Sequence, residues 1–566
     1  MSDARAEWNE TCDLLVAGAG AAGLAAAVAA ARRGLKVIVA EKAEVIGGTT
    51  AWSGGWIWAP CNPVARRNGF TEDSSGPRTY LEAVQGNNFN PELVDAFLDA
   101  APEMIGFLED AGMEFECGAR IPDTYGHLPG AGTGGRSVIA APYDGRRLGD
   151  AIGMLRRPMR ETSFIGMTIQ AGADLRAFMT ATRSVASAVH VGLRLTRHLW
   201  SLARYGRGME LRNGNALVAR LMRAALDAGV ELRTGVAVTE LLRENGQVIG
   251  AVLDGSAGPL RIASARGVVL ACGGYPFDLA RRKATFPHPD QHRTLAVPSA
   301  TGDGLQLGEA AGGHQAQTLA SAGAWCPVSE VLWPDGSKGV FPHIIERGKP
   351  GVIGVLASGR RFCNEGLGYY DYVKELYNAV PGGAPVESWL ICDHRFIRRY
   401  GLGIVRPAPL PLGPWIKSGY LSTGATLGEL ARTCGIDPAG LEDTVARFNT
   451  HAANGEDPEF HRGTTPYMRL QGDPDVTPNP CLAPIETGPF YAVRVIPGSF
   501  GTFAGLQTDG DARVLDADGQ PIAGLYAAGT DMASVMGGHY PAGGINLGPA
   551  LTFGYIAGRH AAGGAK

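Results

Sequence analysis

Three glycines near the N-terminus have the spacing of a phosphate-binding turn. Gly18, Gly20 and Gly23 follow the pattern G-x-G-x-x-G directly after an apolar run. The first permits a tight turn, the second lets the backbone approach a pyrophosphate, and the third lets a helix pack closely on a strand. Phosphate charge can then lie against the unpaired N–H groups of the helix N-terminus. Glu41, 23 residues after Gly18, is placed to accept a hydrogen bond from a ribose 2′-hydroxyl. These residues predict a dinucleotide with an unphosphorylated ribose, either FAD or NAD.

A second turn of small and hydroxyl-bearing residues follows this acidic position. Residues 47–50 read GGTT and residues 53–55 read SGG. A cofactor that lies extended needs such a surface beside its ribityl chain and flavin, whereas an NAD-only dehydrogenase does not. We therefore expect FAD, bound without a covalent link because no motif indicates a histidine attachment. The contacts predicted from the two turns are Gly18, Gly20, Ala22, Gly23, Glu41, Gly48, Thr49, Thr50, Ser53, Gly54 and Gly55.

Strands and helices must hold these turns in place. Residues 14–16 form an apolar run of strand length, and the alanine-rich segment after the glycines predicts a helix. Two later apolar strands end in glycine, at residues 267–274 and 524–529, which places Gly273 and Gly529 near the cofactor. Nucleotide-binding elements thus occur near the beginning, middle and end of the chain. The sequence predicts an α/β fold in which a discontinuous Rossmann-like FAD-binding domain (residues 1–295 and 485–566) carries an inserted α+β catalytic domain for the substrate (residues 296–484).

Hydrophobic periodicity and glycine stops predict further elements between these motifs. Residues 92–112 and 213–229 read as helices, each ending at a glycine. Strands are predicted at residues 230–234, 237–243, 248–253 and 261–262.

Composition excludes several classes of protein. The chain has 566 residues, 45% hydrophobic and 19% charged, so a large globular protein of two or more lobes is expected. Its net charge of -4 gives no basic footprint for nucleic acid. The nine cysteines form no C-x-x-C pair, and the N-terminus is polar, so we expect reduced thiols in the cytoplasm and no export signal. No metal site is expected, because metal-ligand spacing is absent around His127, His343, His394 and His539.

One segment has a membrane-like character. Residues 185–205 are rich in apolar side chains, but Arg194, Arg197, His198 and Arg204 interrupt the run, so it is too polar to span a bilayer. A helix with one packed face and one cationic face is one interpretation. Peripheral contact with a membrane that stores an apolar substrate is the other.

The motifs taken together resemble the 3-ketosteroid Δ1-dehydrogenases, within the wider fumarate reductase and succinate dehydrogenase flavoprotein fold. The similarity extends from about residue 11 to residue 560. The matching stretches are GAGAAG from Gly18, GGTTAWSGG from Gly47, PCNP from Pro60, NE at Asn364 and Glu365, PGSFGT from Pro497, and GLYAAGTDMASVMGGHYPAGGINLGPALTFGYIAG from Gly524. The resemblance implies an FAD-dependent enzyme that introduces a C=C bond next to a ketone.

The resemblance also assigns roles at the substrate. The Tyr540 hydroxyl and the Gly544 N–H would polarise the ketone oxygen, as an oxyanion hole does. Tyr369 would remove the α-proton, with help from Tyr125, and Tyr370 is the alternative base. A tyrosine is a weak base at neutral pH, so the base needs a neighbouring hydroxyl or a cationic environment. The resemblance adds Asp531, Asn546 and Leu547 to the predicted cofactor contacts.

Other functions fit part of this pattern. Δ4 dehydrogenation of a 5α-steroid and dehydrogenation of a smaller cyclic ketone both use related chemistry. A fumarate reductase-type enzyme needs arginines that clamp carboxylates, and residues 539–542 read HYPA where that family has His-Gly-x-Asn-Arg. A flavin-binding protein without turnover is the alternative from another class. The expected partners are a small apolar ketone, with a steroid as first candidate, and an external electron acceptor such as a quinone.

Two departures from the family pattern affect the substrate assignment. The chain has Thr530 and Asp531 where the family usually has Asn after the Ala-Ala-Gly turn, which changes a predicted cofactor contact. It has Ala542-Gly543-Gly544 where the family often has Gly-x-Gly, which reshapes the ketone end of the pocket. The natural substrate therefore does not follow from the motifs.

Overall fold

The computed structural model describes residues 8–256 and 258–564, so the first seven residues of the polar N-terminal segment lie outside it. Its first sheet has six strands in the order β21-β22-β13-β2-β3-β9. β13 pairs in parallel with both β2 and β22, and β2 with β3. Strands from three distant parts of the chain thus form one core, and the discontinuous dinucleotide-binding fold is confirmed. The bounds are β2 Leu14–Ala17, β3 Val37–Glu41, β9 Glu231–Thr234, β13 Val268–Leu270, β21 Arg513–Leu515 and β22 Pro521–Ala527.

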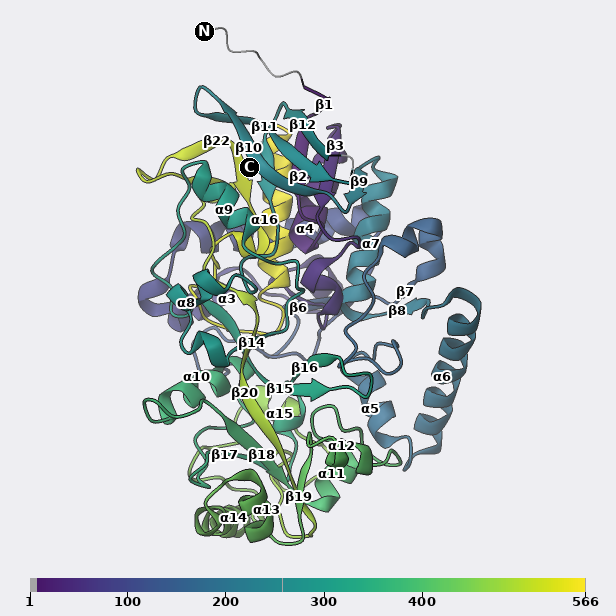
Figure 1. Ribbon diagram of the computed structural model, residues 1–566, viewed down its shortest axis with the longest axis vertical. Helices are drawn as coiled ribbons and strands as arrows, with labels where there is room; N and C mark the ends of the chain where they lie inside the picture. The colour runs from purple at the N-terminus through teal and green to yellow at the C-terminus, as the bar shows by residue number, and fades with distance from the viewer. Residues whose placement is uncertain (1–7, 257, 565–566) are drawn as a thin grey trace.

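Helix α1 (Ala21–Ala31) lies in the centre of this domain. Every residue from Ala21 to Ala30 is buried, because the helix packs against the sheet, α7 (Asn213–Asp227) and α16 (Leu547–Ala561). A Cβ on Gly554 of α16 would lie 2.3 Å from the Ala22 carbonyl oxygen. Small residues on both helices therefore bring their backbones together, and the N- and C-terminal parts of the chain meet beside the glycine turn (Figure 1).

Smaller sheets and helices surround this core. A four-stranded sheet has the order β1-β12-β11-β10, and a three-stranded sheet has the order β4-β6-β5. The predicted helices and strands agree with the structure at their centres, and β12 is longer than predicted because it pairs with both β1 and β11. The bounds are β1 Glu10–Cys12, β4 Trp56–Trp58, β5 Phe115–Cys117, β6 Ser137–Ala140, β7 Tyr143–Asp144, β8 Glu210–Leu211, β10 Ala237–Glu244, β11 Gln247–Gly255, β12 Gly258–Ser264, α2 Pro63–Arg67, α3 Ser75–Gln85, α4 Pro91–Asp110, α7 Asn213–Asp227, α8 Leu279–Thr285 and α9 Asp303–Ala310.

A second lobe is built on a sheet of seven strands, shown in the lower half of Figure 1. Its path is β16-β15-β20-β18-β17, and β14 and β19 also pair with β20. The long strand β20 (Phe490–Thr502) joins this sheet although it follows the predicted domain limit at residue 484. The limits 1–295, 296–484 and 485–566 stay a proposal, and strand pairing favours an insert that includes β20. The other bounds are β14 Arg293–Thr294, β15 Gly323–Leu332, β16 Lys338–Pro342, β17 Val352–Val355, β18 Ser388–Cys392, β19 Ser422–Gly424, α10 Tyr369–Ala379, α11 His394–Tyr400, α12 Gly413–Lys417, α13 Leu427–Cys434, α14 Pro438–Ala452 and α15 Pro466–Gln471.

Two helices project from the side of the molecule. α5 (Ala173–Thr180) leads into α6 (Val185–Tyr205), which lies at the right edge of Figure 1, away from the sheets. The predicted helix is thus present, with its N-cap at Ser184 and a left-handed glycine at its C-terminus. Across the described ranges, no helix combines the length and apolar character required to cross a membrane.

Candidate active site

The pyrophosphate turn shows the close approaches that its glycines predict. Gly18 has φ +101°, and a Cβ there would lie 2.2 Å from the carbonyl oxygen of Ala271. A Cβ on Gly23 would lie 1.9 Å from the Gly18 oxygen. At Gly20 the nearest atom to a Cβ is the Thr50 hydroxyl oxygen, 3.8 Å away. The protein leaves room at Gly20, as expected where a ligand approaches the backbone.

The N-terminus of α1 offers unpaired donors to a phosphate. The N–H of Ala21 donates to the Thr50 hydroxyl at 3.1 Å. The next two N–H groups, of Ala22 and Gly23, find no acceptor among the residues that the structure describes. These donors and the positive end of the helix dipole fit the pyrophosphate of FAD.

Glu41 ends β3, as predicted, and its carboxylate is buried. Its Oε2 accepts a hydrogen bond from the Ala19 N–H at 3.0 Å, and Oε1 accepts one from the Ala43 N–H at 2.9 Å. Each carboxylate oxygen has a further lone pair, so the group retains acceptor capacity for a ribose hydroxyl. Glu41 therefore holds the glycine turn, and its ribose contact stays a prediction.

The GGTT segment forms a short 3-10 turn, η1 (Gly48–Trp52), next to the pyrophosphate turn. The Thr49 hydroxyl accepts a hydrogen bond from the Val297 N–H at 3.1 Å, which joins the turn to the chain segment after β14. A Cβ on Gly48 or Gly54 would meet nothing closer than 4.0 Å. Both glycines leave open space on this surface, as a bound flavin chain requires.

Ser53 and Gly55 serve the turn itself. The Ser53 hydroxyl donates to the Thr50 carbonyl at 2.8 Å and accepts from the Gly55 N–H at 3.1 Å. A Cβ on Gly55, which has φ +77°, would lie 2.5 Å from the backbone of Asn213. Their contact with the cofactor stays a prediction.

Asp531 lies fully buried beneath the turn that follows β13. Its Oδ2 accepts from the Cys272 N–H at 2.5 Å, and its Oδ1 accepts from the Gly274 N–H at 2.8 Å. Burial raises the pKa of this carboxyl to about 6, although the two N–H donors act in the opposite direction. Asp531 thus shapes the turn around Gly273, and any effect on the cofactor would pass through that turn.

Gly529, Asn546 and Leu547 lie where the two ends of the chain meet. A Cβ on Gly529 would lie 3.1 Å from the Ala22 side chain. Asn546 precedes α16, which begins at Leu547, and its Nδ2 donates to the Tyr540 hydroxyl oxygen at 3.3 Å. Asn546 therefore connects the predicted cofactor surface with the tyrosines.

Tyr369 and Tyr540, far apart in sequence, meet edge to face. Their ring centroids are 4.9 Å apart and the rings are inclined by 72°. Tyr369 is the first residue of α10, Tyr540 lies in the turn before α16, and Phe500 of β20 packs 5.4 Å from Tyr369. The predicted base and the predicted carbonyl donor thus lie together at the junction of the two lobes.

Burial governs the acidity of both phenols. It raises the pKa of Tyr369 well above its ordinary value, and the neighbouring Tyr540 raises that pKa further. Burial also raises the pKa of Tyr540. A neutral Tyr540 is a hydrogen-bond donor, as polarisation of a ketone requires. Tyr369 accepts a proton as a base only after losing its own, so its burial works against that role in the free protein.

Gly544 occupies a position that only glycine fits. It has φ +102°, and a Cβ would lie 2.7 Å from the Trp58 nitrogen. Its carbonyl accepts from the N–H groups of Trp58 and Gly548, at 3.1 and 2.8 Å. Its own N–H has no acceptor in the described part of the chain and is available to a ketone oxygen.

Tyr125 and Tyr370 lie beside this pair, but their hydroxyls are engaged elsewhere. The Tyr125 hydroxyl donates to Asp371 Oδ1 at 2.8 Å, so the expected direct help to Tyr369 is not what the geometry shows. The Tyr370 hydroxyl donates to the Gly538 carbonyl at 2.9 Å. Tyr369 therefore stays our choice for the base.

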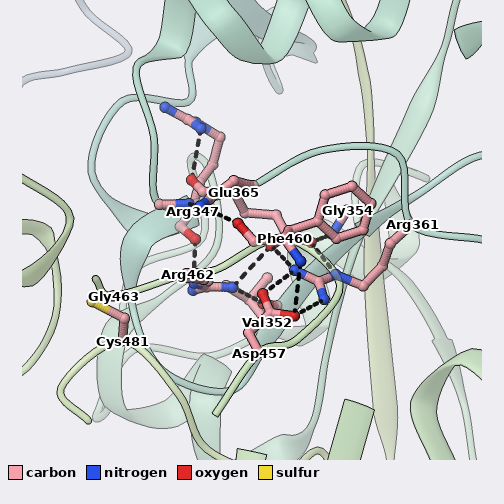
Figure 2. Close-up of polar contacts among 12 residues, drawn as sticks. Arg347, Val352, Gly354, Arg361, Glu365, Asp457, Phe460, Arg462, Gly463 and Cys481 are labelled. Carbon is pink, nitrogen blue, oxygen red and sulfur yellow. Dashed lines mark hydrogen bonds and ion pairs between the residues drawn. The ribbon is translucent and has the colours of Figure 1, made fainter. Parts of the chain in front are cut away.

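A buried ion network supports the segment before Tyr369. Arg361 makes paired bonds with Glu365 at 2.9 and 2.7 Å and with Asp457 at 2.9 Å each, and Arg462 contacts Glu365 at 3.3 Å (Figure 2). Arg347 donates to the Glu365 carbonyl at 2.8 Å. Sequence reasoning missed the arginines and Asp457. Their only signal was the acidic Glu365 of the NE motif, because its partners lie up to 97 residues away.

The chain matches known proteins over almost its whole length. Residues 13–547 match the family model described as FAD binding domain. The chain is 42% identical over 556 residues to 4-oxocyclohex-2-ene-1-carboxylate 5-dehydrogenase of Sinomonas cyclohexanicum, covering 97% of this chain and 94% of that one. It is 36% identical over 563 residues to 3-oxosteroid 1-dehydrogenase of Mycobacterium tuberculosis, covering 97% and 98%.

The structure agrees with these matches. It is similar, with a TM-score of 0.90 and 34% identity, to the crystal structure of 3-ketosteroid Δ1-dehydrogenase from Sterolibacterium denitrificans in complex with 1,4-androstadiene-3,17-dione, covering 98% of this chain and 100% of that one. The protein is an oxidoreductase that acts on CH–CH groups with FAD as cofactor. The chain thus belongs to the FAD-binding family of flavin-dependent dehydrogenases that includes the 3-oxosteroid 1-dehydrogenases.

Proposed function

We propose that the enzyme desaturates a ring ketone at the carbon next to the carbonyl. The observation that carries this proposal is the contact between Tyr369 and Tyr540, whose ring centroids are 4.9 Å apart. The Gly544 N–H, which has no acceptor among the described residues, belongs to the same turn as Tyr540. Tyr540 and Gly544 would hold the ketone oxygen and stabilise the developing enolate, and Tyr369 would remove the α-proton. FAD, when bound, supplies the acceptor for the hydride.

We propose two substrate classes, which share the ketone and differ in ring system. The Sterolibacterium and Mycobacterium relatives are named for 3-ketosteroids, and these support Δ1 dehydrogenation of a 3-ketosteroid. The Sinomonas relative, which has the higher identity, is named for a six-membered ring ketone with a carboxylate and supports a smaller substrate. Within the steroid class, Δ4 dehydrogenation of a 5α-steroid is the alternative to Δ1 dehydrogenation and uses the same chemistry.

Anaerobic mixing separates these substrates. The purified enzyme would be mixed with 4-androstene-3,17-dione, with a 5α-saturated 3-ketosteroid and with 4-oxocyclohex-2-ene-1-carboxylate, and the flavin absorbance and products followed. Rapid bleaching by only one class identifies the ring system, and the position of the new double bond distinguishes Δ1 from Δ4. Failure of every ring ketone to reduce the flavin would refute the proposed function.

We further propose a quinone as the external electron acceptor, since catalysis needs reoxidation of the flavin after each turnover. Enzyme reduced by its ketone would be mixed with a soluble quinone or with oxygen. Reoxidation that is faster with oxygen than with quinone would contradict this assignment.

We propose that α6 contacts an anionic lipid surface, while the body of the protein stays in the cytoplasm. Residues 173–205 hold five arginines and one aspartate, and that aspartate, Asp174, is buried against Arg194. Several outward side chains of α6 are large and apolar, and exposed arginines such as Arg197 and Arg204 lie among them. An interfacial helix combines such a face with cations. The exposed large apolar side chains of α6 are Val185, Val189, Leu193, Leu199, Trp200 and Tyr205.

Vesicle flotation tests the lipid contact. The protein should float with vesicles that contain phosphatidylglycerol and remain behind with phosphatidylcholine alone, and a Val189→Ser, Trp200→Ser variant should float less. Equal flotation of variant and parent would refute the contact between α6 and the lipid surface.

A further inference from the structure

A chain of hydrogen bonds runs from α10 to the turn of Tyr540. Asp371, in the first turn of α10, accepts through Oδ1 from the Tyr125 hydroxyl at 2.8 Å. The Tyr125 N–H donates to the Tyr80 hydroxyl oxygen at 3.2 Å, and that hydroxyl donates to the Pro541 carbonyl at 2.6 Å. Pro541 follows Tyr540 directly, so the chain links the element of the proposed base with the element of the carbonyl donors.

The loop in the middle of this chain is anchored independently. The Thr124 N–H donates to the same Pro541 carbonyl at 2.9 Å. Asp123, which is buried, pairs with the buried Arg136 at 2.5 Å. Because the loop is fixed on this side, its bond to α10 helps to hold the first turn of that helix in place.

The other oxygen of Asp371 is unusual. Oδ2 is buried and has no hydrogen-bond partner within residues 8–256 and 258–564. A Cβ on Gly368, the residue before Tyr369, would lie 2.4 Å from this oxygen. The carboxylate therefore lies against Gly368, directly before Tyr369. A buried acceptor without a partner costs stability, which makes this carboxylate a candidate for a role beyond holding the fold.

We propose that Asp371 is a positioning residue for the dehydrogenation, which through Tyr125 and Tyr80 sets the distance between Tyr369 and Tyr540. The proposal rests on the proposed function of those two tyrosines. It gives the predicted Tyr125 an indirect role: Tyr125 would act on α10 through Asp371, and α10 carries Tyr369.

We call the hydrogen-bond chain from Asp371 through Tyr125 and Tyr80 to Pro541 the clamp. The charge state of Asp371 gives the clamp a pH dependence. Burial raises the pKa of Asp371 to about 6, and the Tyr125 hydroxyl and Lys374 oppose that shift. The carboxylate form, which accepts from Tyr125, is therefore lost as the pH falls through about 6. The titratable and charged groups that face it are Tyr125 from the loop, Tyr80 from α3, Tyr370 and Lys374 from α10, Arg347 from η5 (Glu346–Gly348) and Tyr467 from α15.

A double-mutant cycle tests the clamp. The rate of flavin reduction by the ketone would be measured for Asp371→Ala, for Tyr125→Phe and for the double variant. A misplacement of about 1 Å at a reacting centre costs about 10²-fold in rate, so each single variant should lose about 10- to 100-fold. The double variant should be no slower than the slower single variant, because both changes remove the same bond.

Tyr377→Phe is the matched control on the same helix. Its hydroxyl is buried and has no partner in the described part of the chain, so removing it breaks no bond, and flavin reduction should stay at the parent rate. Asp371→Asn keeps an acceptor for Tyr125 and loses the charge. It should retain more activity than Asp371→Ala, and its rate should no longer fall as the pH drops through about 6.

Urea unfolding of the holoenzyme provides a readout that does not depend on turnover. The same four proteins should show non-additive midpoints, since the bond exists whether or not a ketone reacts. If no ring ketone reduces the flavin of the parent enzyme, the proposed function is wrong. The urea midpoints alone then show whether Asp371 and Tyr125 are coupled. Three results would each overturn the positioning role. They are additive losses in both the reduction rate and the urea midpoint, flavin reduction at the parent rate in Asp371→Ala, and a reduction rate in Asp371→Asn that still falls as the pH drops through about 6.

Discussion

The ion network of the second lobe contacts the segment before α10, and the tyrosine site includes the first residue of α10; the two regions differ in how their polar groups are paired. In the network, both oxygens of Glu365 receive donors, from Arg361, Arg462 and the Gly354 N–H. In the tyrosine site, the Gly544 N–H lacks an acceptor among the described residues. The paired carboxylate of Glu365 fixes the geometry of the network, whereas the N–H of Gly544 is available to a ligand.

This difference explains how a short segment can carry a base. Arg347 donates to the carbonyls of Glu365 and Leu367, at 2.8 and 3.4 Å, and α10 begins two residues later. The N-cap of α10 is Gly368, which supplies no side-chain bond. Support for the first turn of α10 therefore comes from the network before it and from Asp371 within it.

The largest effect should come from removing the base. Tyr369→Phe keeps the ring that packs on Tyr540 and loses the proton acceptor, so the rate of flavin reduction should fall by about 10²- to 10⁴-fold. Stopped-flow mixing with the ketone measures this half-reaction alone. FAD content should equal that of the parent. A near-normal rate would transfer the base role to Tyr370 or to another residue.

Breaking the network should destabilise the fold. Glu365→Ala leaves the buried Arg361 with Asp457 and leaves the buried Arg462 with no carboxylate partner among the described residues. Loss of one member of a buried ion pair costs about 3–5 kcal/mol in the free energy of unfolding. Urea unfolding measures it, with Glu375→Ala on the exposed face of α10 as control. If Glu365→Ala unfolds at the same urea concentration as the parent, the network does not contribute to stability.

Removing one carbonyl donor should have a somewhat smaller effect than removing the base. Tyr540→Phe leaves Gly544 as the remaining donor, and losing one oxyanion-hole donor costs about 10²- to 10³-fold in rate. The variant should also bind the ketone more weakly, which a titration of the oxidised enzyme with product would show. Reduction at the parent rate would refute carbonyl activation by Tyr540.

Much of the cofactor domain was predictable from the sequence because its signals are local. A tight turn with φ +101° at Gly18 and close packing at Gly23 require glycine, and the spacing of these residues is visible in a few letters. The parallel strands are continuous apolar runs, which periodicity reveals. The domain limit near residue 484 was less secure, since β20 joins a sheet through pairings that no local pattern encodes.

The site was predictable only as far as its motifs extend. Tyr369, Tyr540 and Gly544 came from resemblance, and the structure brings the two tyrosines together. Asp371 was missed, since an acidic residue in the first turn of a helix is common and its partner Tyr125 lies 246 positions away. The expectation that Tyr125 faces the base came from motif matching, which carries no information on where a hydroxyl points.

The smallest predicted effect concerns Asp531, where a saturated carboxylate supports the cofactor turn. Asp531→Asn retains one acceptor and turns an NH₂ group toward the N–H of Cys272 or Gly274, so one bond becomes a repulsive contact. A hydrogen bond to a charged group contributes about 1.5–3 kcal/mol, so FAD should dissociate about 10- to 100-fold more readily. Equilibrium dialysis of FAD measures this without any substrate.

Because the pKa of Asp531 is raised to about 6, FAD affinity of the parent should also fall as the pH drops through that value, and the Asn variant should lose that dependence. The same pH range governs Asp371, but there it should alter the rate of flavin reduction and leave FAD affinity unchanged. Equal FAD affinity in parent and variant across this range would confine Asp531 to the fold and remove it from the predicted cofactor residues.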